Sequence, residues 1–176
     1  MKPQCSQRLL LRTFTVADIN PHYVGALNDW SVVGRTEARH RSWDLESVQS
    51  YVDNATKLNE SQLIGLFLRD TEEHIGNVRL SSFNNRHVEL GIMIHAKQHW
   101  GKGFAAEALG EIDRYVFDVL SLHKICADYH ADNFASATIF RKAGYVIEGV
   151  FKDHFYVRDR FVDSVRIARF THQYVR

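Results

Sequence analysis

The chain has 176 residues, of which 45% are hydrophobic and 24% charged, and its formal net charge at pH 7 is +1. These proportions are those of an ordinary globular protein, so we expect residues 1–176 to form one domain with its own core. The near-zero charge argues against nucleic-acid binding, which usually requires a strongly basic face. No apolar run approaches the roughly 20 residues of a membrane span.

The start of the chain lacks the apolar core of a signal peptide. The two cysteines, Cys5 and Cys126, are far apart and have no metal or redox spacing. We therefore expect a reduced, cytoplasmic protein. The histidines also lack metal-ligand spacing, so we expect no metal ion.

Hydrophobic periodicity and turn residues predict the elements of the N-terminal half. They are a strand over 8–12, a helix from its cap at Thr15 to about 28, an irregular polar segment over 30–43, and a helix beginning near Asp44. Strands over 62–69, 74–83 and 87–95 follow, separated by tight turns.

The C-terminal half continues with a long helix from 104, a strand over 123–129 and a helix capped by Asn133 and ended by Gly144. Two last strands, 145–154 and 161–171, read as a hairpin. This order predicts a mixed α/β (α+β) domain with a largely antiparallel sheet.

The segment between the strand over 87–95 and the helix from 104 reads Gln98-His99-Trp100-Gly101-Lys102-Gly103. Glycines let backbone N–H groups approach a ligand closely, and the first turn of a helix has unpaired N–H groups. Such a loop favours negative charge, and we expect a phosphate-bearing ligand there.

This loop resembles the Q/R-x-x-G-x-G/A phosphate-binding signature of the GNAT superfamily of acyl-CoA N-acyltransferases. Two further stretches match that family in register. The first is Asn133-Phe134-Ala135-Ser136 with Phe140, Gly144-Tyr145 and Glu148-Gly149, and the second is a closing hairpin with Phe155-Tyr156 and Arg160-Phe161-Val162-Asp163-Ser164-Val165. The chain resembles in particular the RimJ/RimL-like branch.

The resemblance implies the GNAT fold, with about seven mostly antiparallel strands flanked by about four helices, and acetyl-CoA as co-substrate. The pyrophosphate of acetyl-CoA is expected at the glycine loop, and its pantetheine arm beside the strand over 87–95. The implied cofactor-binding residues are Ile92, Met93, Ile94, Gln98, His99, Trp100, Gly101, Lys102, Gly103, Phe104, Ala105, Asn133, Ser136, Phe140 and Arg141. Lys102 either adds charge or points into solvent.

Acetyl transfer requires a neutral amine, a polarised thioester and a proton for the thiolate. Glu89 is the candidate general base, because strand alternation places it beside the expected thioester; otherwise it is a solvent-facing or salt-bridged carboxylate. Ser136 is the candidate proton donor, because Phe140 replaces the tyrosine that many relatives carry; otherwise it only bonds to backbone. Tyr129 and Tyr156 are the reserve donors.

The segment over 30–43 is where the acceptor enters in relatives. The candidate acceptor-binding residues are Trp30, Glu37, Arg39, His40 and Tyr156. Arg35, Arg39, His40 and Arg41 favour an anionic acceptor, whereas Glu37 favours an ammonium group. For each of these residues the alternative is a place in a solvated polar loop.

The expected function is transfer of an acetyl group to a primary amine by direct attack, the acceptor being a small molecule or a protein N-terminus. The alternative is a non-catalytic acyl-CoA-binding or sensor domain. A P-loop is disfavoured because the glycine spacing does not match GxxxxGK[ST]. Both a monomer and a homodimer are compatible with the sequence.

Overall fold

One sheet runs through the molecule, with the strand order β1-β2-β3-β4-β5-β6-β8-β7. The structure is a computed structural model that describes residues 4–57 and 61–171. Within them the strands are β1 (Gln4–Cys5), β2 (Leu9–Thr13), β3 (Ser61–Leu68), β4 (His74–Asn84), β5 (His87–Ile94), β6 (Lys124–His130), β7 (Val146–Val157) and β8 (Arg160–Phe170). Neighbouring strands are antiparallel except β5 and β6, which are parallel.

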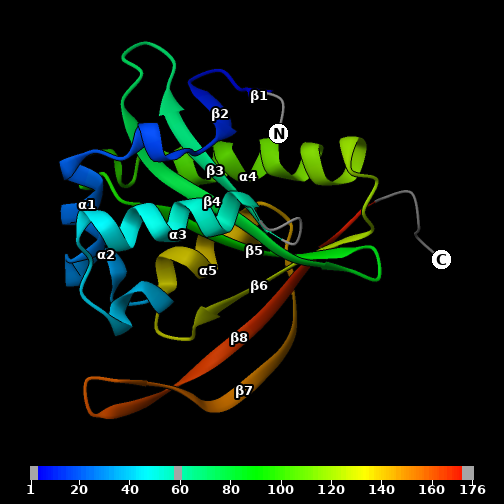
Figure 1. The fold of residues 1–176 in the computed structure, drawn as a ribbon. Helices are drawn as coiled ribbons and strands as arrows, with labels where there is room; N and C mark the ends of the chain where they lie inside the picture. Colours follow the sequence, from blue (N-terminus) through cyan, green and yellow to red (C-terminus); the bar gives the residue numbers. More distant parts are fainter. Residues whose placement is uncertain (1–3, 58–60, 172–176) are drawn as a thin grey trace.

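The helices of the described residues are α1 (Pro21–Leu27), α2 (Trp30–Val33), α3 (Leu45–Lys57), α4 (Phe104–Arg114) and α5 (Phe134–Lys142). Short 3₁₀ turns occur at η1 (Val16–Asp18), η2 (Glu37–His40) and η3 (Lys97–His99), and a π-helical turn, η4 (Tyr115–Val119), extends α4. In Figure 1, α3 crosses the near face of the sheet, and the β7–β8 hairpin reaches away from the helices.

Each face of the sheet has its own apolar core, because strand side chains alternate between faces. On one face α4 and α5 pack on strand residues that include Val88 and Leu90. On the other face α1, α2 and α3 pack on residues that include Leu63 and Phe67, with Met93 at the margin. Val88 and Leu90 of β5 thus face one core and Met93 the other, as alternation along a strand requires.

The helix predicted from Thr15 to about 28 is interrupted: Thr15 caps only the 3₁₀ turn η1, and a separate helix, α1, begins at Pro21. Asn20 is extended, with φ −133°, and its side chain accepts the Tyr23 N–H at 3.0 Å. Pro21 then occupies the first position of α1, where a missing N–H costs nothing. The cap and the proline together begin a new helix instead of continuing η1.

The predicted irregular segment over 30–43 is partly helical. It contains α2, capped by Asp29, which accepts the Ser31 N–H at 2.9 Å, and the turn η2. The other predicted strands and helices are confirmed within a few residues at their ends, and β1 was not predicted. Gly144 follows α5 with φ +82°, as expected for a helix C-terminus.

Candidate active site

β5 and β6 are paired over only three residues before they separate. The register joins His87 to Lys124, Val88 to Ile125 and Glu89 to Cys126. Beyond that point β5 pairs with β4 as far as Ile94, while β6 pairs with β8. Among the described strands, none pairs with the edge of β5 over 90–94 that faces β6, so this edge is open to a ligand.

The open edge of β5 presents backbone groups of Ile92. The N–H of His95 donates to the Ile75 carbonyl of β4 at 2.9 Å. Because N–H groups alternate along a strand, those of Ile92 and Ile94 point the other way, toward β6. The Ile94 carbonyl already accepts the Trp100 indole N–H at 2.7 Å. Ile92 therefore offers an N–H suited to polarising a carbonyl oxygen.

The loop that follows β5 contains two glycines in the left-handed region. Gly101 has φ +74°, and Gly103, the residue before α4, has φ +84°. Within the described residues, the N–H groups of residues 101–106 donate no hydrogen bond outside the helix, and the three in the first turn of α4 lack intrahelical partners by geometry. The predicted anion site is thus present as a loop with free donors at a helix start.

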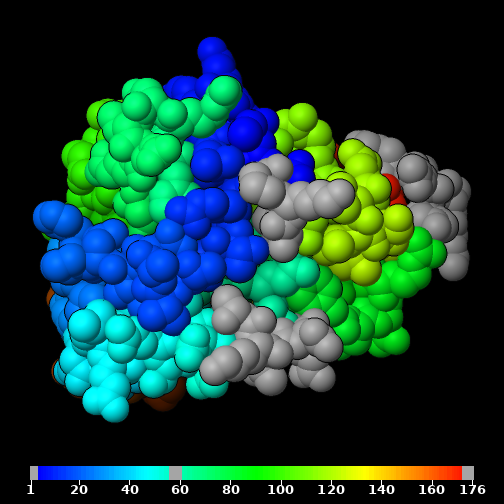
Figure 2. Space-filling view, turned by 45° about the horizontal axis from the view of Figure 1, so that its top comes forward, coloured from blue at the N-terminus to red at the C-terminus, as the bar shows by residue number. Residues whose placement is uncertain are grey.

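Arg8, just before β2, holds this loop against α4. Its guanidinium donates to the Lys102 carbonyl at 3.0 Å and to the Glu107 carboxylate at 2.7 Å, and it lies 4.3 Å from the centre of the Phe104 ring. Figure 2 shows the N-terminal residues (blue) between α3 (cyan) and the part of the chain around α4 (yellow-green). This contact occupies the Lys102 carbonyl and ties the loop to the first turn of α4.

Side chains of the loop anchor it to the β3–β4 turn. Gln98 and His99 both contact the Glu73 carboxylate, at 2.7 and 3.0 Å. Lys102 is exposed. The loop therefore presents backbone groups to a ligand, and its longer side chains mostly fasten it in place.

Asn133 caps α5, and its side-chain oxygen accepts the Ser136 N–H at 3.2 Å. The Ser136 side chain is half-buried, and its hydroxyl makes no hydrogen bond to another described residue. Phe140 is buried between the rings of Tyr129 and Tyr145, so its contacts are with the core. Arg141 is exposed.

Glu89 is held in an ion pair. Both of its oxygens accept hydrogen bonds from Arg166 of β8, at 2.5 and 2.7 Å, and Arg166 also binds Asp128 of β6 at 2.7 Å. Hydrogen bonding to Glu89 raises the pKa of Arg166. Both carboxylate oxygens of Glu89 are therefore already engaged by one guanidinium group.

The segment over 30–43 reaches the C-terminal end of β6. Arg35 binds Asp132, which follows β6, at 3.2 Å, and Asp132 also pairs with Arg160 of β8. Arg158 of the β7–β8 turn lies 4.6 Å from the centre of the Trp30 ring. Three elements far apart in the chain therefore meet beside the separated ends of β5 and β6.

The predicted acceptor residues lie in this junction or next to it. Glu37 pairs with Arg39 at 3.2 Å and His40 at 3.5 Å. Tyr156 is exposed, and its hydroxyl contacts Asp159 at 3.4 Å. Arg41 instead stacks on Trp43 at 3.7 Å.

Sequence reasoning missed His130, the last residue of β6. Its side chain is 3% exposed, and its ring stacks on Phe155 of β7 at 4.0 Å. Burial lowers the pKa of His130, and the charge of Arg39 adds to the effect, so the ring is neutral at pH 7. Alternation on β6 would have placed it on the same face as Asp128 and, across the gap, Glu89.

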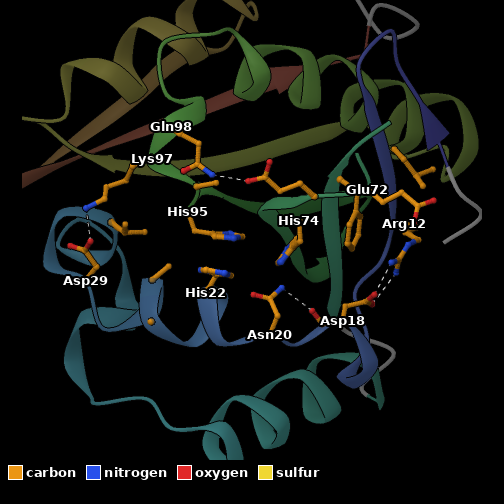
Figure 3. Close-up of a pocket in the computed structure, with 17 residues that line it drawn as sticks. Arg12, Asp18, Asn20, His22, Asp29, Glu72, His74, His95, Lys97 and Gln98 are labelled. Carbon is orange, nitrogen blue, oxygen red and sulfur yellow. Dashed lines mark hydrogen bonds and ion pairs between the residues drawn. The ribbon is translucent and has the colours of Figure 1, made fainter. Parts of the chain in front are cut away.

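A separate pocket of about 830 Å³ lies between α1 and the ends of β4 and β5 (Figure 3). His74 and His95 point toward each other there, with ring centres 4.6 Å apart. Of the predicted site residues only Gln98 lines it. Within the described part of the chain no helix is long and apolar enough to cross a membrane.

The sequence is similar to that of known acetyltransferases. Residues 8–146 match the family model described as an acetyltransferase (GNAT) domain. The chain is 30% identical over 156 residues to the N-acetyltransferase YoaA of Bacillus subtilis, covering 86% of each protein. It is 33% identical to the ribosomal protein uS5 alanine N-acetyltransferase of Escherichia coli, over 85% of this chain and 76% of that one.

Among solved structures, spermidine N-acetyltransferase of Vibrio cholerae in complex with CoA and spermine superposes with a TM-score of 0.83. The alignment covers 94% of this chain and 96% of that one at 22% identity, which shows a shared fold. The protein therefore belongs to the GNAT acetyltransferases and is an acetyl-CoA-dependent N-acetyltransferase.

Proposed function

We propose that acetyl-CoA lies in the gap between β5 and β6, with its pyrophosphate on the N–H groups of residues 101–106. The observation that supports this is the coincidence of free donors at the start of α4 with the open edge of β5. The Ile92 N–H would polarise the thioester carbonyl. Asn133 and Ser136 would flank the far side of the pantetheine arm, and Ser136 would donate a proton to the leaving thiolate.

Glu89 is the residue predicted from the sequence to act as the general base. It lies three residues before Ile92, which is about 10 Å along a strand. That separation and the ion pair with Arg166 restrict it to a route through water.

For the acceptor we propose a primary amine that carries a negative charge. The observation behind this is the excess of arginines at the junction of α2, η2 and the β7–β8 turn. The positively charged side chains at this junction are Arg35, Arg39, Arg158 and Arg160, and the negatively charged ones are Glu37, Asp132 and Asp159. Two of the arginines, Arg35 and Arg160, pair with the same carboxylate, Asp132. Such a site attracts a phosphate or carboxylate and repels a polyamine. An acidic N-terminal peptide and a small phosphorylated amine satisfy the same chemistry.

The test uses acceptors that differ only in charge. We expect kcat/KM, followed as thiol release from acetyl-CoA, to be about 10-fold or more higher for O-phosphoethanolamine than for ethanolamine, as one or two charged hydrogen bonds would give. The peptide Ala-Glu-Glu should likewise exceed Ala-Lys-Lys, and added salt should reduce both preferences. Arg160→Gln should lower the rates of the anionic acceptors selectively.

Equal rates within each pair, or a preference for Ala-Lys-Lys and spermidine, would contradict the anionic acceptor.

Residues 1–176 are proposed to work as one catalytic domain, as a monomer or homodimer, in the cytoplasm. The single continuous sheet and the two free cysteines support that proposal.

A further inference from the structure

We propose that His130 accepts the proton of the acceptor ammonium directly, in place of the water-mediated route from Glu89. This assignment rests on the proposed placement of acetyl-CoA in the gap between β5 and β6. It follows from the register of the two strands, the face on which His130 lies and the groups around it.

The strand register places His130 at the height of the reacting thioester. Glu89 is level with Cys126, so continuing the parallel register sets Ile92 level with Tyr129 and Met93 level with His130. The Ile92 N–H is the proposed donor to the thioester carbonyl. His130 is therefore opposite the reacting carbon, whereas Glu89 lies about 10 Å behind it.

The imidazole is also on the side from which the acceptor arrives. Ile125 and Ala127 of β6 belong to the core under α4 and α5. Alternation turns Asp128 and His130 to the opposite face, where the segment over 30–43 and Phe155 meet. Asp128 is paired with Arg166, whereas the His130 ring makes no ion pair or hydrogen bond to another described residue.

The surroundings keep His130 unprotonated and ready to accept a proton. Arg35, Glu37 and Arg39 face it from the segment over 30–43, and Asp132 faces it from the turn after β6. Phe155 covers the ring from β7, and Ser164 of β8 is its uncharged strand partner. Burial and the arginines lower the pKa of His130 more than the carboxylates raise it.

The proton balance is simple. One proton of the ammonium passes to a ring nitrogen of His130, and the neutral amine attacks the thioester carbon. The C–S bond then breaks. A second proton leaves the amine nitrogen and reaches the departing thiolate through Ser136, and His130 releases its own proton to water. The products are the acetylated amine, CoA and one released proton.

The test is the pH dependence of kcat/KM for the acceptor, measured with O-phosphoethanolamine, β-alanine or ethanolamine, using the fastest of the three. If His130 is the base, the enzyme requires neutral His130 and an ammonium acceptor. The wild-type profile should then be level from the pKa of His130 up to that of the amine, near ~10.

The His130→Gln variant has no base to deprotonate the ammonium group, so only the fraction of amine that is already unprotonated in solution can react. We expect kcat/KM to rise about 10-fold per pH unit, with a loss of about 100-fold at pH 7.5 that disappears near pH 10. His154→Gln is the matched control, because His154 also contacts Phe155 but is exposed. It should keep the level profile, and Glu89→Gln should keep the level shape even if its rate falls.

A level profile in His130→Gln, or a uniform loss at every pH, would overturn the assignment, and so would a sloping wild-type profile. If Glu89→Gln alone produces the slope, the water-mediated route is the correct one. Phe155→Leu gives a second readout, because uncovering His130 should move the acid limb to higher pH. Absence of thiol release with all three amines, with acetyl-CoA still bound, would instead refute the proposed acceptor chemistry.

Discussion

Gly103 combines two requirements that a side chain would not meet. Its φ of +84° lies in the left-handed region, which costs an L-residue about 1 kcal/mol or more, and its N–H is among the donors proposed for the pyrophosphate. A Cβ there would lie 3.6 Å from the Arg8 guanidinium, which is ordinary contact. The constraint is thus backbone conformation and ligand approach, and crowding inside the protein contributes little.

Gly103→Glu should therefore abolish acetyl-CoA binding while the protein still folds. The added carboxylate would repel the pyrophosphate at the place where α4 otherwise attracts it. Calorimetric titration with acetyl-CoA should show at least a 100-fold rise in Kd, and circular dichroism should be close to wild type. Gly110→Glu adds the same charge at an open position of α4, and its Kd should change little.

Unchanged affinity in Gly103→Glu would show that the loop does not hold the pyrophosphate.

At the scale of elements, N-cap side chains fix the first turns of three helices. Asn20, Asp29 and Asn133 each accept an N–H of the first turn of their helix. Asn133 matters most, because its cap fixes the turn that carries Ser136. The position of the proposed proton donor therefore depends on one side-chain oxygen.

Asn133→Ala should destabilise the protein by about 1 kcal/mol, the usual value of an N-cap, and lower Tm by about 2–4 °C. Asn133→Ser keeps a capping oxygen and should recover most of that loss. Thermal unfolding followed by circular dichroism measures both variants. Equal Tm values for Asn133→Ala and wild type would mean that the cap contributes nothing to stability.

At the scale of the whole molecule, two buried histidines sit between the sheet and α1. Burial lowers the pKa of His74 to about 3, with His95 adding to the effect, and burial lowers the pKa of His95 to about 4. The folded state thus holds both rings neutral, whereas the unfolded chain protonates them near pH 6.5. Their contribution to stability is complete above about pH 6.5 and is lost as the pH falls toward 3–4.

The free energy of unfolding should therefore fall between pH 6.5 and 4, by up to about 1.4 kcal/mol per pH unit for each histidine. Asp113 acts in the opposite sense, because burial raises its pKa to about 6 and its contribution is lost as the pH rises. Urea unfolding of His95→Phe isolates one histidine and should show a smaller slope than wild type. His22→Gln, an exposed change at the same pocket, removes only a minor charge effect on His95 and should change the slope far less than His95→Phe does.

An identical slope in His95→Phe and wild type would contradict the buried neutral state of His95.

Much of the fold and of the donor site could be predicted because local rules govern those features. Alternation along β5 separates Glu89 from Val88 whatever the rest of the chain does. A glycine pair before a helix and an asparagine at a helix start impose backbone geometry within a few residues. The glycine loop, the Asn133 cap and most strands follow from such neighbours.

Other features depend on residues that only the folded chain brings together. Glu89 and Arg166 are 77 positions apart, and their pairing decides whether that carboxylate is free. His130 becomes a buried neutral base only when Phe155 and Arg39 are packed around it. Short-range patterns state which residues share a face, but the charge and availability of a side chain depend on its neighbours in space, and these come from distant strands.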